Sequence, residues 1–234
     1  MIEIIAEIGQ NFNGDIRLAK ELIRLAKING ADVAKFQVYD AKSLFTKENN
    51  QWYEYNCSTE LTKEHIKILM DECESVGIEF MASAFDGERV EWLKNLGVKR
   101  FKVASRSVQD NTLIGEIIST KRPLIVSLGM WDGEELPKIK AESKIDFLYC
   151  ISNYPTKLES LHFDNVNFKS KYSGFSDHTI GIVAPIVAMS RGARIIEKHF
   201  TIDKNMFGPD HSCSMTPNEL NDLVKYKEQI SQCL

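Results

Sequence analysis

The sequence predicts one α/β domain folded as a closed (β/α)₈ barrel, and three observations support this prediction. Eight short apolar runs alternate with longer amphipathic stretches along the 234 residues. Glycine follows several of the amphipathic stretches, where the C-cap of a helix is expected. The chain has no glycine-rich phosphate-binding fingerprint, which favours the closed barrel over the competing architecture, the open doubly wound sheet.

The strand candidates are short and rich in β-branched residues. Strands that alternate with helices imply parallel neighbours, because a parallel pair needs a long crossover connection. In chain order the strand candidates are Ile2–Ile8, Asp32–Val38, Ile78–Ala82, Arg100–Ala104, Leu124–Leu128, Ile145–Ile151, Tyr172–Ser176 and Arg194–His199.

The helix candidates carry apolar residues at helical spacing, as between Ile16 and Ala26. The glycines that stand between such a stretch and the next strand are Gly30, Gly77, Gly97 and Gly192. The least regular stretch, Asp40–Ser58, follows the second strand and is therefore expected on the catalytic face. No linker or shift in composition divides the chain, so residues 1–234 are expected to form a single barrel domain.

Charge and cysteine usage exclude several classes of protein. A net charge of −4 and a pI near 5.8 give no electrostatic reason to bind nucleic acid. The five scattered cysteines lack metal-ligand spacing and are typical of reduced thiols, which predicts a cytoplasmic protein. The amino terminus has no signal-peptide pattern, and no apolar run approaches about 18 residues, so no membrane attachment is expected.

Polar side chains gather where the predicted strands end, and in a (β/α)₈ barrel these carboxyl ends form the rim of the active site. Alternation along each strand puts Lys35 with Gln37, and Glu197 with His199, on the inner face, whereas Lys198 is expected to face the helices. The candidate rim residues are Glu7, Lys35, Gln37, Lys102, Ser105, Ser127, Ser152, Tyr154, Ser176, His178, Glu197 and His199.

Two lysines stand inside apolar strands. Lys35 and Lys102 are expected to point into one cavity, where two ammonium groups and several hydroxyls suit a phosphate or a carboxylate. The alternative is that each lysine extends from a strand edge to solvent.

His178 and His199 end neighbouring strands, about 4.8 Å apart, so they can share one divalent metal ion. Spacing alone is equally consistent with ordinary hydrogen-bonded histidines. Glu7 is interpreted as a general base or as the partner of a lysine, and Asp210 as a site residue or part of a Pro-Asp turn.

From Ile4 to about Leu220 the chain resembles the sialic acid synthase family, which comprises N-acetylneuraminate synthase and its legionaminate and pseudaminate relatives. The segments that carry the resemblance, in family order, are Ala6–Gly14, Ala34–Gln37, Lys102–Ser105, Ser127–Met130, Tyr154–Thr156, Gly174–Thr179, Glu197–Thr201 and Gly208–His211.

The resemblance implies a barrel that condenses phosphoenolpyruvate with the aldehyde of an N-acylated amino sugar, giving a nine-carbon 2-keto-3-deoxy acid and phosphate. It implies that His178 and His199 hold Mn²⁺ or Mg²⁺, with waters and the sugar aldehyde oxygen as further ligands. It assigns phosphoenolpyruvate to Lys35, Lys102, Ser105, Ser127, Ser152, Tyr154 and Ser176, and the sugar to Glu7, Gln37 and Asp210. Glu7, Lys102 and Asp210 are the expected catalytic residues.

Three departures concern the sugar half of this expectation. Phe12 stands where the family usually has histidine, and Arg106-Ser107 stand where it has a small or aromatic residue followed by an acid. Many relatives also carry a carboxyl-terminal antifreeze-like domain, which is expected to be absent because the chain ends at Leu234. We therefore expect a changed sugar specificity, a missing part supplied by another protein, or weak activity.

Three other functions remain open. One is a Schiff-base aldolase with Lys102 or Lys35 as nucleophile. A second is a catalytically silent subunit that binds phosphoenolpyruvate or sugar, and a third is condensation with pentose or tetrose phosphates. A homodimer through barrel helices is the expected assembly.

Overall fold

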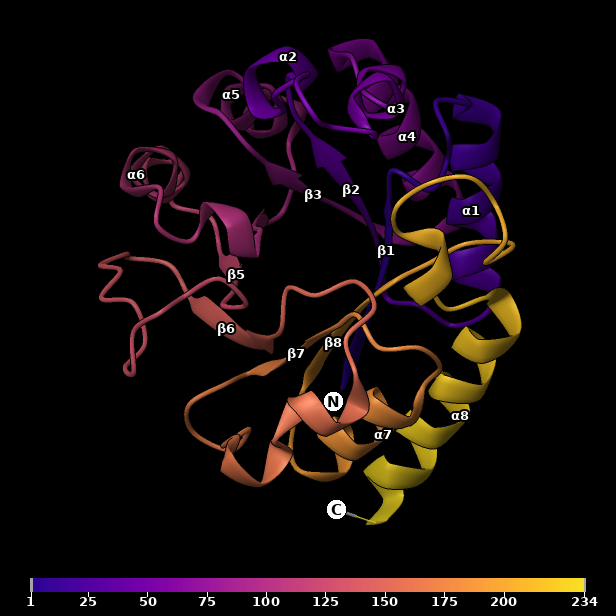
Figure 1. Cartoon of the computed structure of the whole chain (residues 1–234), viewed down its shortest axis with the longest axis vertical. Coiled ribbons are helices and arrows are strands. Elements are labelled where there is room, and N and C mark those ends of the chain that lie inside the picture. The colour runs from indigo at the N-terminus through magenta and orange to yellow at the C-terminus, as the bar shows by residue number, and fades with distance from the viewer. Residues whose placement is uncertain (1, 234) are drawn as a thin grey trace.

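The eight predicted strands form a closed parallel barrel in chain order, with β1 paired to β8 (Figure 1). The structure is a computed structural model that describes residues 2–233. Each strand lies within two residues of its predicted bounds, so the predicted fold class is confirmed. The strands are β1 (Glu3–Gly9), β2 (Val33–Val38), β3 (Glu79–Ala84), β4 (Phe101–Val103), β5 (Leu124–Ser127), β6 (Ile145–Cys150), β7 (Gly174–Asp177) and β8 (Ile195–His199).

The helices surround the barrel, and their ends carry the expected capping residues. The Asp15 side chain accepts the amide N–H of Arg17 at the start of α1. Gly77 and Gly97 end α4 and α5 in the left-handed conformation, at φ 73° and 90°. The helices are α1 (Ile16–Ile28), α2 (Ala41–Leu44), α3 (Tyr53–Ser58), α4 (Lys63–Val76), α5 (Gly87–Leu96), α6 (Asn111–Ser119), α7 (Val183–Ser190) and α8 (Pro217–Cys233).

Two of the crossover connections depart from the expected alternation of strand and helix. Residues 128–144, between β5 and β6, contain no helix, and the β6–β7 connection contains only the short 3₁₀ turns Leu158–Leu161 and Phe163–Asn165. In residues 128–144, two glycines, a proline and many charged residues leave too few apolar positions for an amphipathic face. Beside β6, the ring of helices in Figure 1 is accordingly incomplete.

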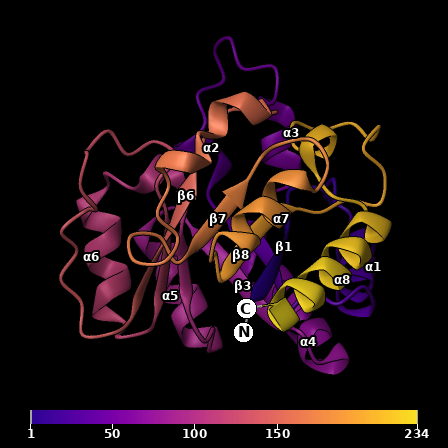
Figure 2. The same cartoon turned by 90° about the horizontal axis from the view of Figure 1, so that it is seen from below.

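The irregular stretch that follows β2 is more ordered than the sequence predicts, because it contains α2 and α3. In the side view of Figure 2 these two helices lie at the end of the barrel to which the strands point, and α8 ends at the opposite pole. Within residues 2–233, no helix combines the length and apolarity that crossing a bilayer requires.

The inside of the barrel is apolar at one end. One layer of side chains there consists of Ile5, Val33, Met81, Ile125, Leu148 and Ile195. All six are buried, so this layer closes the amino-terminal end of the barrel and leaves the carboxyl-terminal end as the place for a site.

Candidate active site

Two residues further along the strands, the side chains that point into the barrel are polar. Since side chains alternate along a strand, the residue two positions after each member of the apolar layer also points inward. In the six strands concerned these residues are Glu7, Lys35, Ser83, Ser127, Cys150 and Glu197. All six are buried, which means that the strands place a polar layer directly on an apolar floor.

Lys35 belongs to this polar layer, Lys102 of β4 lies beside it, and the two lysines share a carboxylate partner. The Lys35 Nζ atom lies 2.8 Å from Glu7 Oε2 and 3.7 Å from Glu197 Oε1. The Lys102 Nζ atom lies 3.7 Å from the same Glu197 oxygen. The lysines are only 2% and 1% exposed, so the alternative in which they reach solvent from a strand edge is wrong.

The pKa values of the two ammonium groups shift in opposite directions. Burial acts to lower the pKa of Lys35, but Glu197 and Glu7 together raise it above its ordinary value. Burial lowers the pKa of Lys102, and Glu197 offsets this only in part. Lys35 is therefore a fixed positive charge, and Lys102 is the more readily deprotonated of the two.

Sequence reasoning placed Glu197 on the inner face but assigned it no role. In the structure its Oε1 atom is close to both lysines and accepts a hydrogen bond from Ser176 at 3.3 Å, while its Oε2 atom has no hydrogen-bond partner within residues 2–233. The available signal was its alternation with His199 on β8. Its position between two lysines depends on barrel closure, which no local pattern reveals.

The serine hydroxyls surround the glycine that follows β5. The Gly129 amide N–H donates to Ser105 Oγ at 3.1 Å. A Cβ atom at Gly129 would lie 2.5 Å from Ser152 Oγ and 2.8 Å from Cys150 Sγ, so only glycine leaves this space open. Ser127 and Ser152 have buried hydroxyls without a hydrogen-bond partner in the described part of the chain. These hydroxyls are free to donate to an anion.

Cys150 is a second residue that sequence reasoning missed. Its thiol lies 3.4 Å from Ser105 Oγ and 3.9 Å from His178 Nδ1. Its inward position on β6 could have been found from alternation, since Leu148 and Ser152 belong to the same face.

The two predicted metal-binding histidines lie side by side. Their ring centroids are 5.6 Å apart, and the Tyr154 ring lies 4.0 Å from that of His178. The His178 Nδ1–H group donates to the carbonyl of Ile151 at 2.9 Å, which leaves Nε2 as the atom with a lone pair. His199 Nδ1 has no hydrogen-bond partner among residues 2–233, and Asp210 Oδ2 lies 3.9 Å from it.

This arrangement fits a divalent ion held by two protein ligands. Two imidazoles that bind one ion at about 2.1 Å have ring centres roughly 4.5 to 5.5 Å apart, and the observed 5.6 Å is close to the upper end of that range. Burial lowers the pKa of His199, whereas burial of His178 is outweighed by Cys150, which raises the pKa of that ring, so the geometry of the pair carries the fit. Over the described residues no group of three or more His, Cys, Asp or Glu forms a metal cluster. Substrate and water would have to supply the other ligands.

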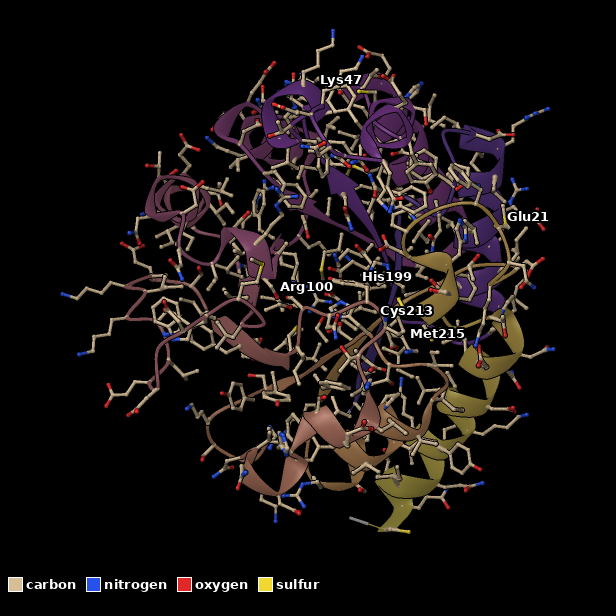
Figure 3. The ribbon with its side chains drawn as sticks, viewed as in Figure 1. Glu21, Lys47, Arg100, His199, Cys213 and Met215 are labelled. Atoms are coloured by element: carbon tan, nitrogen blue, oxygen red, sulfur yellow. The ribbon has the colours of Figure 1, made fainter. Side chains whose placement is uncertain are left out.

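The remaining predicted residues complete the rim. Gln37 Nε2 donates to Glu7 Oε1 at 3.0 Å, so Gln37 holds the second oxygen of the carboxylate that pairs with Lys35. Asp210 lies on the connection after β8, beside His199. Figure 3 shows His199 near the centre of the ring, with Cys213 and Met215 of that connection close to it. The Met215 amide donates to the His199 carbonyl at 2.7 Å, which fixes the connection over the barrel.

The loops after β1, β2 and β8 are joined by buried polar groups. Asn11 Nδ2 donates to the Phe200 carbonyl and to Ser214 Oγ. Tyr55 of α3 donates to Asn13 Oδ1 at 2.7 Å, and His211 Nε2 lies 3.1 Å from the same oxygen. The irregular stretch after β2 therefore lies on the catalytic face, as predicted.

Phe12, the first departure from the family pattern, lies outside the site. Its side chain is 1% exposed, and its ring packs edge-on against Phe36, 6.3 Å between centroids. Phe36 alternates with the inward Lys35 and Gln37 and so faces the helices, where it stacks on Phe80. This departure changes core packing around β2. Lys198 also faces outward, as predicted, and pairs with buried Asp177 at 2.7 Å.

Fold and site together define a (β/α)₈-barrel enzyme with an anion-binding interior and a two-histidine rim. Residues 22–234 match the NeuB family, and the chain belongs to that family. The resemblance to sialic acid synthases is thereby confirmed.

Named relatives cover most of the chain. An N,N'-diacetyllegionaminic acid synthase of Legionella pneumophila is 39% identical over 254 residues, covering 95% of this chain and 70% of that protein. The human N-acetylneuraminate-9-phosphate synthase is 33% identical over 256 residues, covering 99% and 70%. The crystal structure of N-acetylneuraminic acid (sialic acid) synthetase from Leptospira borgpetersenii, in complex with citrate, superposes with a TM-score of 0.89 at 30% identity, covering 99% of this chain and 84% of that one.

Proposed function

We propose that this enzyme condenses phosphoenolpyruvate with the aldehyde of an N-acylated amino sugar, giving a nonulosonic acid and inorganic phosphate. One observation carries the proposal: two buried lysines share Glu197 at 3.7 Å, beside a pair of facing histidines and serine hydroxyls that have no hydrogen-bond partner among residues 2–233. An interior of this kind is built for a small polyanion that reacts next to a metal ion.

Phosphoenolpyruvate carries a phosphate and a carboxylate, and the polar layer offers groups to both. Lys35 and Lys102 supply positive charge, and Tyr154 closes the pocket beside His178. The hydroxyls that would donate to the substrate are those of Ser105, Ser127, Ser152 and Ser176.

The balance of charges inside the barrel predicts which group the substrate displaces. The charges of two lysines and two glutamates, Glu7 and Glu197, nearly cancel inside the barrel. A phosphate ester brings about two negative charges at neutral pH, and the substrate carboxylate adds another. Phosphoenolpyruvate would therefore take the place of Glu197 as the partner of Lys102, and the carboxylate of Glu197 would turn away.

His178 and His199 would hold the divalent ion, Mn²⁺ or Mg²⁺. When bound, the ion supplies Lewis-acid polarisation of the sugar aldehyde. Gln37 and Asp210 would orient the sugar at the rim, where Asp210 lies beside His199.

Glu7 would stabilise the positive charge that develops at C2 of phosphoenolpyruvate as C3 bonds to the aldehyde carbon. The oxygen of a water molecule bonds to C2, and a carboxylate passes one of the water's protons to the aldehyde oxygen, which becomes a hydroxyl. The second proton goes to the departing phosphate as the C2=O double bond forms and the bond between C2 and the phosphate oxygen breaks. Phosphate then leaves. Loss of one such group typically lowers the rate by about 10²-fold or more.

The test is phosphate release from phosphoenolpyruvate with Mn²⁺ or Mg²⁺ and a panel of N-acylated hexosamines, both neutral and 6-phosphorylated. Release that depends on both the metal and a sugar supports the synthase function. Binding of phosphoenolpyruvate without release across the panel would favour the silent subunit, for which Ser107 in place of the usual acid is the motivating observation.

The lowered pKa of Lys102 favours one rival, a Schiff-base aldolase. Borohydride reduction in the presence of pyruvate separates the two mechanisms, because covalent labelling of Lys102 or Lys35 would replace the metal-assisted mechanism. A cytoplasmic location and a homodimer through barrel helices complete the proposal, and light scattering during gel filtration tests the dimer.

A further inference from the structure

Arg106 occupies the rim of the site directly after a residue of the phosphoenolpyruvate pocket. It belongs to the 3₁₀ turn Ser105–Ser107 at the carboxyl end of β4. Its Nη2 atom donates to the Leu44 carbonyl at 3.3 Å, and its guanidinium carbon lies 5.1 Å from the centre of the Phe45 ring. Arg106 therefore crosses from the β4 turn to the connection after β2, over the edge of the barrel.

The guanidinium has donors to spare. An arginine offers five N–H donors, and the bond to Leu44 is the one hydrogen bond of the Arg106 side chain within the described residues. No carboxylate oxygen of residues 2–233 lies within 4.0 Å of it, whereas Arg17, Arg24 and Arg100 are each paired with acids. Stacking on Phe45 holds the group in place without neutralising it.

The surroundings also leave the charge of Arg106 uncompensated. Ser107 is buried and neutral, and it stands where an acid is usual in the family pattern. Partial burial lowers the pKa of Arg106, and the electrostatic effect of Tyr154 opposes this. The rim thus presents a positioned cation between the turn after β4 and the connection after β2.

We infer that Arg106 binds a phosphate group on the sugar acceptor, so that the enzyme prefers an N-acylated amino-sugar phosphate to the neutral sugar. The inference rests on the proposed synthase function and names the charge of its second substrate. Family membership leaves that charge open, because the relatives' names include one phosphorylated product and one unphosphorylated product at comparable coverage. A guanidinium with free, diverging N–H groups is the side chain best suited to a phosphate.

The experiment compares steady-state phosphate release with each N-acylated hexosamine and its 6-phosphate. The native enzyme should have a KM for the phosphorylated sugar about 10- to 100-fold below that for the neutral sugar. Arg106→Gln should remove this preference by raising the KM for the phosphorylated sugar by a similar factor, with kcat nearly unchanged. Arg106→Lys should restore part of it, because the charge returns without the planar donor fork.

Arg191→Gln is the matched control, since Arg191 follows α7, at the end opposite the catalytic face, and is also partly exposed. It should leave both KM values unchanged. Equal efficiency of the native enzyme with the two forms of sugar, or equal losses for both forms in Arg106→Gln, would overturn the inference and leave the synthase function standing. No release with any sugar in either form would overturn the synthase function, and the inference with it.

Discussion

Glu197→Gln should lower the free energy of unfolding of the protein and lower its Kd for phosphoenolpyruvate. Glu197 is 7% exposed, and its Oε1 atom lies 3.7 Å from each lysine Nζ. At that distance and an effective dielectric constant of about 20, each attraction is about 4 to 5 kcal/mol before desolvation is subtracted. Glutamine fills the same space but leaves two ammonium groups with only the Glu7 carboxylate.

Removal of one partner from a buried ion pair typically costs about 3 to 5 kcal/mol. We take the lower end, about 3 kcal/mol, because the amide oxygen of glutamine can still accept the Ser176 hydrogen bond and turns its partial negative charge toward the lysines. For a chain of this length that loss lowers Tm by about 6 to 12 °C. Phosphoenolpyruvate would no longer compete with a carboxylate, so its Kd should fall by about tenfold, which corresponds to about 1.4 kcal/mol.

The assay pairs thermal unfolding without ligand with calorimetric titration of phosphoenolpyruvate at fixed salt. Asp177→Asn is the matched control: Asp177 is equally buried and pairs with Lys198 at 2.7 Å, but on the outer face of the barrel. It should lower Tm comparably without tightening phosphoenolpyruvate binding. Weaker or unchanged binding by Glu197→Gln would refute the view that Glu197 occupies the position of the substrate anion.

Three further substitutions test other parts of the site. His199→Gln should weaken Mn²⁺ binding by about 10- to 100-fold, as followed by titration of the free ion, whereas His65→Gln on α4 should not; equal affinities would exclude His199 as a ligand. Gly129→Ala should raise the Kd for phosphoenolpyruvate by more than about tenfold, because its Cβ enters the space between the hydroxyls and the thiol, whereas Gly115→Ala in α6 meets nothing within 4 Å and should bind normally. Phe12→Ala should lower the free energy of unfolding by about 3 to 5 kcal/mol with the KM for the sugar unchanged, and a large change in that KM would place Phe12 in the site after all.

Local patterns in the sequence were sufficient for the barrel and for most of its rim. Apolar runs separated by amphipathic stretches predicted all eight strands, since the repeats of strands and helices are local properties of the chain. Alternation then separated inward Lys35 and Gln37 from outward Lys198. The helix expected between β5 and β6 did not form, because residues 128–144 lack an apolar face.

Tertiary structure decided which of those side chains meet. Glu197 reaches Lys35 only because β8 pairs with β1 and closes the ring, and its distance from Lys102, on the opposite wall, depends on the width of the barrel. Phe12 faces the helices although it directly follows the buried polar pair Gln10 and Asn11, because the turn after β1 rotates it outward. Alternation tells which face a residue occupies; the register and closure of the sheet determine what lies across from it.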